Sequence, residues 1–253
     1  MRHSTVFTAV LTGALLVTAA AGARAQSPEA LTPEQAKLAC AIPAALELPR
    51  VGGYRIAGGQ HVDPRGLLGP RDLIVLDGGS QAGLQLGQQF FARRSVTLGA
   101  SWPRRPRGVY TSGVIRVVAL SDTAAIASVD LACGDILPGD YIDPFVVPAV
   151  PDGMDRADVS GEPDFGSLGR VVFGADEMRT GATGDFMIID QGSQDGLAPG
   201  ARLAIYRDLR KPGLPLASIG EAIVVSTSPA TSVMRINAAR DAIASGDFVA
   251  RRK

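Results

Sequence analysis

The stretch DLIVLDGGSQAGLQLG at residues 72–87 returns in altered form as DFMIIDQGSQDGLAPG at residues 185–200. In both stretches an apolar run ends at an aspartate, and a glycine-rich segment follows with serine, glutamine and leucine in the same places. Short apolar runs bounded by turn residues are typical of buried β-strands. The two stretches therefore predict two strand–loop–strand units of one design.

A second matched pair follows in the same order, at residues 113–142 and 220–249. Each block contains apolar runs of strand length and closes on a Gly-Asp pair, at 139–140 and 246–247. Five or six short strands in each copy, with no helical stretch between them, favour small barrels or sandwiches. We expect an all-β protein with two tandem small antiparallel β-barrel or sandwich domains that arose by internal duplication.

A short helix is expected before the first copy. Thr32 is a suitable N-cap, Pro33 is tolerated in the first turn, and Gln35 completes a capping box. Residues 147–163 hold three prolines with several Gly, Asp and Ser, which is typical of a linker. The expected organisation is a signal peptide at 1–25, a helical brace at 26–49, repeat 1 at 50–146, a linker at 147–163 and repeat 2 at 164–253.

The N-terminus has the layout of a cleavable secretory signal peptide. A basic start precedes an uncharged apolar run at residues 6–21, and Ala23-Arg24-Ala25 supplies the cleavage pattern. The alternative is a membrane anchor, but the run is shorter than the roughly 20 residues that span a bilayer. We expect a periplasmic or secreted protein with no membrane span after cleavage.

Composition narrows the function classes. The chain carries 25 Lys+Arg and 25 Asp+Glu, which argues against a general nucleic-acid binder, and its 46% hydrophobic content argues against disorder. Of the two histidines only His61 follows the leader, so a multi-histidine metal site is not expected, and no cofactor is implied. In an oxidising compartment the two cysteines, Cys40 and Cys133, are expected to form a disulfide.

Two catalytic or ligand-binding interpretations of the repeated motif compete with a structural one. A phosphate-binding loop requires a following helix, whereas strand-type residues follow both glycine-rich segments. Asp77, Asp190, Asp140 and Asp247 form no spacing that demands a catalytic pair, and His61 has no counterpart in the second copy. We therefore expect turn glycines and aspartates that bond to backbone N–H groups, with no catalytic residue.

Basic segments lie at the same place in both copies, over residues 93–108 and 207–215. Arginine forks beside a tryptophan are suited to an anionic or carbohydrate-bearing partner, while the alternative is a pair of solvated hairpin loops. The candidate binding residues are Arg93, Arg94, Trp102, Arg104, Arg105, Arg107, Arg207, Arg210 and Lys211.

The order of motifs resembles a small β domain of bacterial envelope proteins. The shared features are G-S-x-x-G-L-x-x-G after an apolar strand, G-x-(I/V)-x-V-V, and I-x-x-G-D-(Y/F)-(I/V), within residues 72–146 and 185–250. The C-terminal domain of flagellar assembly protein T is similar, as are modules found beside LysM peptidoglycan-binding domains and, distantly, the β domains of the rod-shape protein MreC. The resemblance implies a scaffold role without catalytic residues.

We therefore expect a non-enzymatic periplasmic or cell-surface module that engages an envelope protein or peptidoglycan. The alternative is a ligand-binding or hydrolytic protein that uses a cleft between the two repeats.

Overall fold

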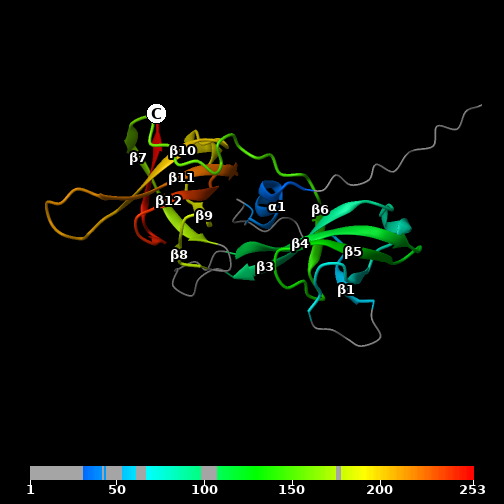
Figure 1. Cartoon of the computed structure of the whole chain (residues 1–253). Coiled ribbons are helices and arrows are strands. Elements are labelled where there is room, and N and C mark those ends of the chain that lie inside the picture. The colour runs from blue at the N-terminus through cyan, green and yellow to red at the C-terminus, as the bar shows by residue number, and fades with distance from the viewer. Residues whose placement is uncertain (1–30, 42, 44–52, 61–66, 98–106, 175–177) are drawn as a thin grey trace, which may run out of the picture. The chain divides into compact units, whose positions relative to one another are not determined.

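The computed structural model describes residues 31–41, 43, 53–60, 67–97, 107–174 and 178–253. The expected signal peptide over 1–25 lies outside the described residues, as do His61, Trp102, Arg104 and Arg105. Within the described residues the chain forms one α-helix and two antiparallel β-structures, each built from six main strands (Figure 1).

The helix α1 (Pro33–Cys40) begins as its sequence predicts. The Thr32 hydroxyl accepts a hydrogen bond from the Gln35 N–H at 3.2 Å, and the Gln35 side chain accepts one from the Thr32 N–H at 2.9 Å. The buried Ala39 packs with Phe91 and Val114 of the first sheet. The helix therefore covers an apolar patch on that sheet. None of the helices in the described part of the chain is long and apolar enough to cross a membrane.

The predicted disulfide is present: Cys40, at the end of α1, is bonded to Cys133, which directly follows β5 of the first sheet. The helix is thus held to the sheet by a covalent link as well as by apolar contacts.

The first sheet is antiparallel and curled, with the strand order β1-β2-β5-β4-β3-β6. Its two outer strands approach each other, since Arg55 and Tyr141 form an isolated bridge and Asp140 O accepts a hydrogen bond from Ile56 N at 2.8 Å. Fully buried side chains such as Ile74, Leu76 and Ile115 fill its concave side. Its strands are β1 (Ile56–Gly59), β2 (Leu73–Leu76), β3 (Gln89–Thr97), β4 (Arg107–Leu120), β5 (Ala125–Ala132) and β6 (Tyr141–Pro144).

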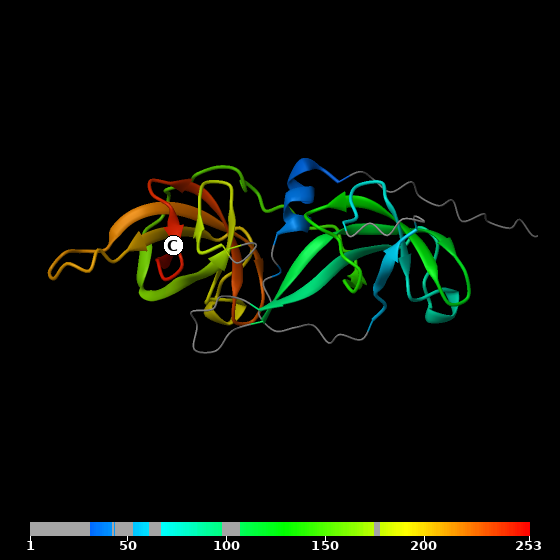
Figure 2. The same ribbon diagram turned by 90° about the horizontal axis from the view of Figure 1, so that it is seen from below.

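The second β-structure is a closed barrel, with the order β7-β9-β12-β11-β10-β14 and with β14 paired back to β7 (Figure 2). Met187, Ile205 and Met234 are fully buried in its core. Its strands are β7 (Pro163–Gly174), β9 (Phe186–Ile189), β10 (Arg202–Arg207), β11 (Ala217–Thr227), β12 (Ser232–Ala239) and β14 (Phe248–Arg252), and a two-stranded sheet pairs β8 (Thr180–Gly181) with β13 (Ile243–Ala244).

The predicted turns in the glycine-rich segments are confirmed. One turn of 3-10 helix follows β2 at Ser80–Ala82 and another follows β9 at Ser193–Asp195. Gly83 and Gly196, which end these turns, have φ of 83° and 80°, a left-handed conformation that favours glycine. The leucine after each of these glycines is buried and the next strand follows, as the structural interpretation expects.

The first basic segment differs from the expected loop. Residues 93–97 belong to β3, and β4 begins at Arg107, so Arg93, Arg94 and Arg107 stand in strands. Beyond a bulge at Ala92, β3 and β4 pair in regular antiparallel register. The paired residues run from Arg93, opposite Thr111, to Thr97, opposite Arg107. The expectation of a single loop over 93–108 is therefore wrong.

Removal of the disulfide is expected to destabilise the first sheet. Serine at both Cys40 and Cys133 should lower the free energy of unfolding by about 4 kcal/mol, because the bond closes a loop with a sequence separation of 93. Urea unfolding followed by circular dichroism, with and without reductant, measures this loss. Reductant should lower the midpoint of the native chain and leave the double variant unchanged. Two free thiols found by mass spectrometry without reductant would contradict the pairing.

Candidate binding surface

The two arginines of β3 are engaged within their own sheet. Arg93 Nη1 lies 3.0 Å from Asp143 Oδ2, and the guanidinium stands 4.2 Å above the centroid of the Phe91 ring. Arg94 donates a hydrogen bond to the Asp135 carbonyl, and its Nε lies 3.9 Å from Asp140 Oδ1. These two candidate binding residues therefore have structural partners.

Arg207, at the end of β10, is held still more firmly. Its Nε and Nη2 donate to the two carboxylate oxygens of Asp247 at 2.8 and 2.7 Å, and its Nη1 donates to Asp241 at 2.7 Å. These hydrogen bonds, above all those to Asp247, raise the pKa of Arg207. The bidentate pair with a carboxylate that is only 6% exposed makes Arg207 a structural residue.

The aspartates of the repeated motif bond to backbone N–H groups, as expected. Asp77 and Asp190 accept from the N–H groups of Arg55 and Arg170 at 2.5 and 2.6 Å. The Gly-Asp pairs behave alike: the side chain of Asp140 accepts from Leu137 N at 3.1 Å, and that of Asp247 from Ala244 N at 2.6 Å. Asp140 also accepts from the Ser112 hydroxyl at 2.7 Å.

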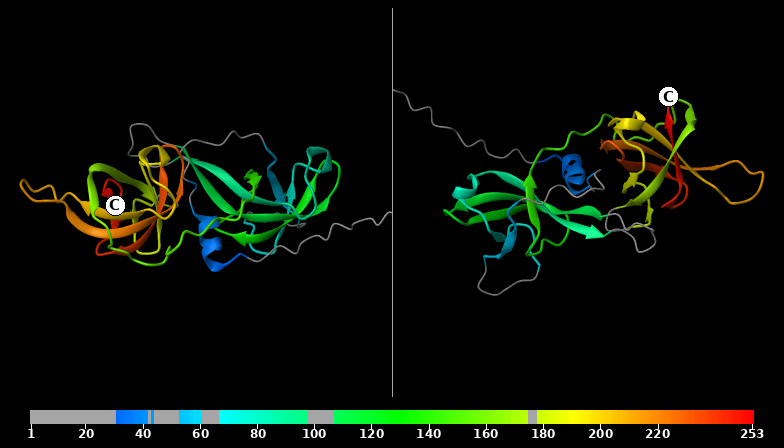
Figure 3. Two further views of the ribbon diagram at one scale, coloured as in Figure 1. Left: turned by 90° about the horizontal axis from the view of Figure 1, so that it is seen from above. Right: turned by 180° about the vertical axis from the view of Figure 1, so that it is seen from behind.

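Arg210 and Lys211 have a different setting, in the hairpin that joins β10 to β11. This hairpin, residues 208–215, is exposed throughout and extends away from the barrel (Figures 1 and 3). Its turn is ordered locally, with Asp208 Oδ1 accepting from Arg210 N at 2.7 Å and Leu214 N donating to Lys211 O at 3.2 Å. Among the described residues no ion pair or side-chain hydrogen bond engages either cation.

A partly exposed row of aromatic side chains lies at the base of this hairpin. Tyr206 is opposite Phe248 in the pairing of β10 with β14, and Phe248 is opposite Arg170 in the pairing of β14 with β7. Phe165 of β7 places its ring centroid 5.1 Å from that of Tyr206, and the Arg170 guanidinium stands 4.1 Å above the Phe248 ring. We call Phe165, Tyr206 and Phe248 the aromatic row.

No local sequence pattern predicts the aromatic row. Its three members come from three strands that are distant in the chain, and only the strand register brings them together. An aromatic residue at an outward position of a strand was the one available signal, and it does not reveal which strands become neighbours.

The segment between the two β-structures is attached to the barrel. The buried Met154 packs with Phe173 and Ile223 on the outer side of the barrel. The Met154 carbonyl accepts hydrogen bonds from Asn237 Nδ2 at 2.6 Å and Arg235 Nη1 at 3.0 Å. Much of the expected linker is therefore packed against the second β-structure.

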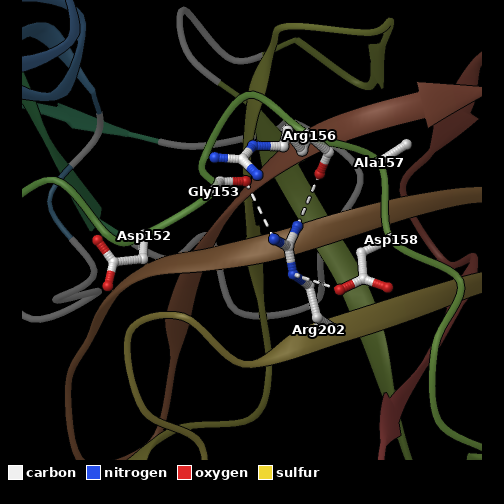
Figure 4. A pocket seen from close by; sticks show the side chains of 6 residues that line it. All are labelled: Asp152, Gly153, Arg156, Ala157, Asp158 and Arg202. Carbon is white, nitrogen blue, oxygen red and sulfur yellow. Dashed lines mark hydrogen bonds and ion pairs between the residues drawn. The ribbon is translucent and has the colours of Figure 1, made fainter.

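A shallow pocket of about 360 Å³ opens beside this segment, with Arg202 at its floor (Figure 4). The Arg202 guanidinium donates to the carbonyls of Arg156 at 2.7 Å and Gly153 at 3.1 Å, and lies 3.8 Å from Asp158. Hydrogen bonds from Ser160 lower the pKa of Asp158. The central cation of the pocket is thus occupied in holding the segment, and the hairpin with the aromatic row remains the stronger candidate surface.

No group of three or more His, Cys, Asp or Glu side chains within the described ranges is arranged to hold a metal ion. The chain matches no protein-family model, and a search of curated proteins finds no similar sequence.

Asparagine at position 247 is expected to destabilise the barrel by about 3 kcal/mol. The substitution leaves the Arg207 guanidinium without its buried carboxylate. Asp241→Asn is the matched control because Asp241 contacts the same guanidinium but is 64% exposed, so its loss should cost less than about 1 kcal/mol. Urea unfolding of both variants measures the difference. Equal losses would contradict the structural role of Asp247.

Tyr141 makes the stability of the first sheet sensitive to alkaline pH. Burial, with the nearby Asp143 carboxylate, raises the pKa of Tyr141 from 10.0 to about 12. The unfolded chain then releases the proton first, so the stabilisation is complete below pH 10 and is lost as pH rises from 10 to 12. Phenylalanine at 141 should weaken this decline, measured by urea unfolding from pH 8 to pH 12. An unchanged decline would assign it to other groups.

Proposed function

We propose that the protein is a non-enzymatic envelope module that engages an envelope protein or peptidoglycan through the hairpin at 208–215. The observation that carries the proposal is the contrast between Arg207, which is paired inside the barrel, and the exposed Arg210 and Lys211 next to it. Local turn bonds order the backbone at these two residues and leave both cationic side chains exposed. Such an arrangement presents positive charge to an anionic partner.

The non-enzymatic part of the proposal rests on how the carboxylates are used. The four aspartates of the repeated motif hold backbone N–H groups in the same way in both β-structures. Because the same structural role recurs in both β-structures, it accounts for these aspartates without a catalytic function. The resemblance to scaffold domains agrees with this interpretation.

We further propose that the two β-structures arose by duplication and that the protein is exported by its predicted signal peptide. Both sheets use the same strand order, and equivalent hydrogen bonds recur in both, such as Ser80 N to Ser121 O and Ser193 N to Ser228 O, each at 2.9 Å. A disulfide fits an oxidising compartment outside the cytoplasm.

The binding role of the hairpin is tested by co-sedimentation with purified peptidoglycan sacculi and by affinity capture from an envelope extract. Serine at both Arg210 and Lys211 is expected to weaken binding about tenfold, since each charged hydrogen bond contributes roughly 1.5–3 kcal/mol before solvent screening. Added salt should also weaken binding by the native protein.

The matched control replaces two other exposed arginines with serine: Arg71, which precedes β2 in the first sheet, and Arg156, whose carbonyl binds Arg202 at the opposite end of β10 from the hairpin. This double variant removes the same charge away from the hairpin. Its binding should remain within about twofold of the native protein. Equal weakening by both double variants would reject a specific role for the hairpin. Failure of the native protein both to sediment with sacculi and to capture an envelope protein would reject the proposed function.

A further inference from the structure

We propose that the aromatic row and the hairpin form one continuous binding surface for an acidic glycan strand, an inference that rests on the proposed function and narrows its partner to peptidoglycan. The row would stack against sugar rings, and the hairpin cations would bind carboxylates carried by the strand.

The aromatic row is set into the rigid wall of a closed barrel. Tyr206 and Phe248 are opposite each other in an antiparallel pair, and residues so paired point to the same face. Their neighbours Ile205 and Val249 are fully buried in the core, so the two aromatic side chains point outward. Strand pairing therefore fixes the spacing and direction of these two rings before any ligand arrives.

Phe165 is the exposed end of the row. Its side chain is 54% exposed although it has an aromatic neighbour, Tyr206, at 5.1 Å. Tyr206 and Phe248 are partly exposed beside it, and contiguous apolar surface on a barrel wall is a feature that marks interaction sites. Rings of this kind offer a flat apolar face, and tyrosine adds a hydroxyl for hydrogen bonding, which suits the alternating apolar faces and hydroxyl edges of a sugar chain.

The third ring of the row, Phe248, is already in contact with an arginine. The Arg170 guanidinium stacks at 4.1 Å on the Phe248 ring and donates to the Gly246 carbonyl at 3.2 Å. Arg170 therefore holds Phe248 in position, and Phe165 and Tyr206 are the rings left open to a ligand.

The first sheet lacks this surface at the corresponding strands. Tyr141 is opposite Arg93 there, where Phe248 is opposite Tyr206 in the barrel. Arg93 is engaged with Asp143, and Tyr141 is buried with 4% exposure. The aromatic row is therefore a property of the second β-structure and not of the shared design.

The distance between the two parts favours a polymer over a single sugar. Lys211 follows Tyr206 by five residues, which corresponds to a separation of up to about 16 Å at the rise of a β-strand. A chain of linked sugars with acidic substituents reaches both the rings and the cations. The same hairpin also carries two exposed apolar side chains, Leu209 and Leu214.

Two soluble probes test the inference by calorimetry with the purified full chain: peptidoglycan strands that retain their acidic stem peptides, and neutral oligomers of N-acetylglucosamine. Phe165→Leu and Tyr206→Leu keep apolar bulk but remove the ring. Each is expected to raise the Kd for both probes about five- to tenfold. The double variant Arg210→Ser and Lys211→Ser should raise the Kd for the acidic strands only.

Phe145→Leu is the control, because it removes a ring from an aromatic pair on the first sheet, and it should leave both Kd values unchanged. Melting temperatures of all variants exclude loss of fold. Native binding that the ring variants do not alter would overturn the glycan surface while leaving the proposed function in place. Capture of an envelope protein without binding to either probe would also overturn it. Absence of any partner would reject the proposed function itself.

Discussion

Both β-structures depend on the interactions made by the buried aspartate of each Gly-Asp pair. In the barrel, the Asp247 carboxylate binds Arg207 of β10 and the Ala244 N–H, while its carbonyl accepts from Val171 of β7 at 2.9 Å. One residue thus joins the incoming strand β14 to both of its neighbours and closes the barrel. Asp140 has the same position in the first sheet, where its carbonyl accepts from Ile56. Because the carboxylate is buried, leaving its charge unpaired would cost free energy. This cost limits the other ways in which the closing strand can pair.

Much of the fold could be predicted from local signals. The capping box at Thr32, the apolar runs of β2 and β9 and the turn glycines each specify structure within a few residues, and all are found as predicted. The Cys40–Cys133 bond followed from there being two cysteines in the chain. The extent of β3 could not be predicted, because arginines in a solvated hairpin loop and arginines in a paired strand have the same local composition. Register, not composition, decides between them.

The candidate site shows the same division. The sequence indicated the hairpin cations, but it did not distinguish Arg207 from Arg210, three residues apart. The difference arises because Arg207 is the last residue of β10 and faces the buried carboxylate of Asp247, directly before β14, whereas Arg210 follows the end of the strand. The aromatic row depends on register across β10, β14 and β7, so no single segment contains its signal.

The placement of Met154 has a consequence for where each unit begins. An outer apolar patch of the first sheet is covered by α1, and one on the barrel by the segment around Met154. In both cases the cover comes from the stretch of chain that precedes the strands. Each unit is therefore a cover followed by a sheet, and the second unit starts near residue 150, ahead of its first strand. A protein cut at residue 163 would lose the lining of its own barrel wall and present Phe173 and Ile223 to water.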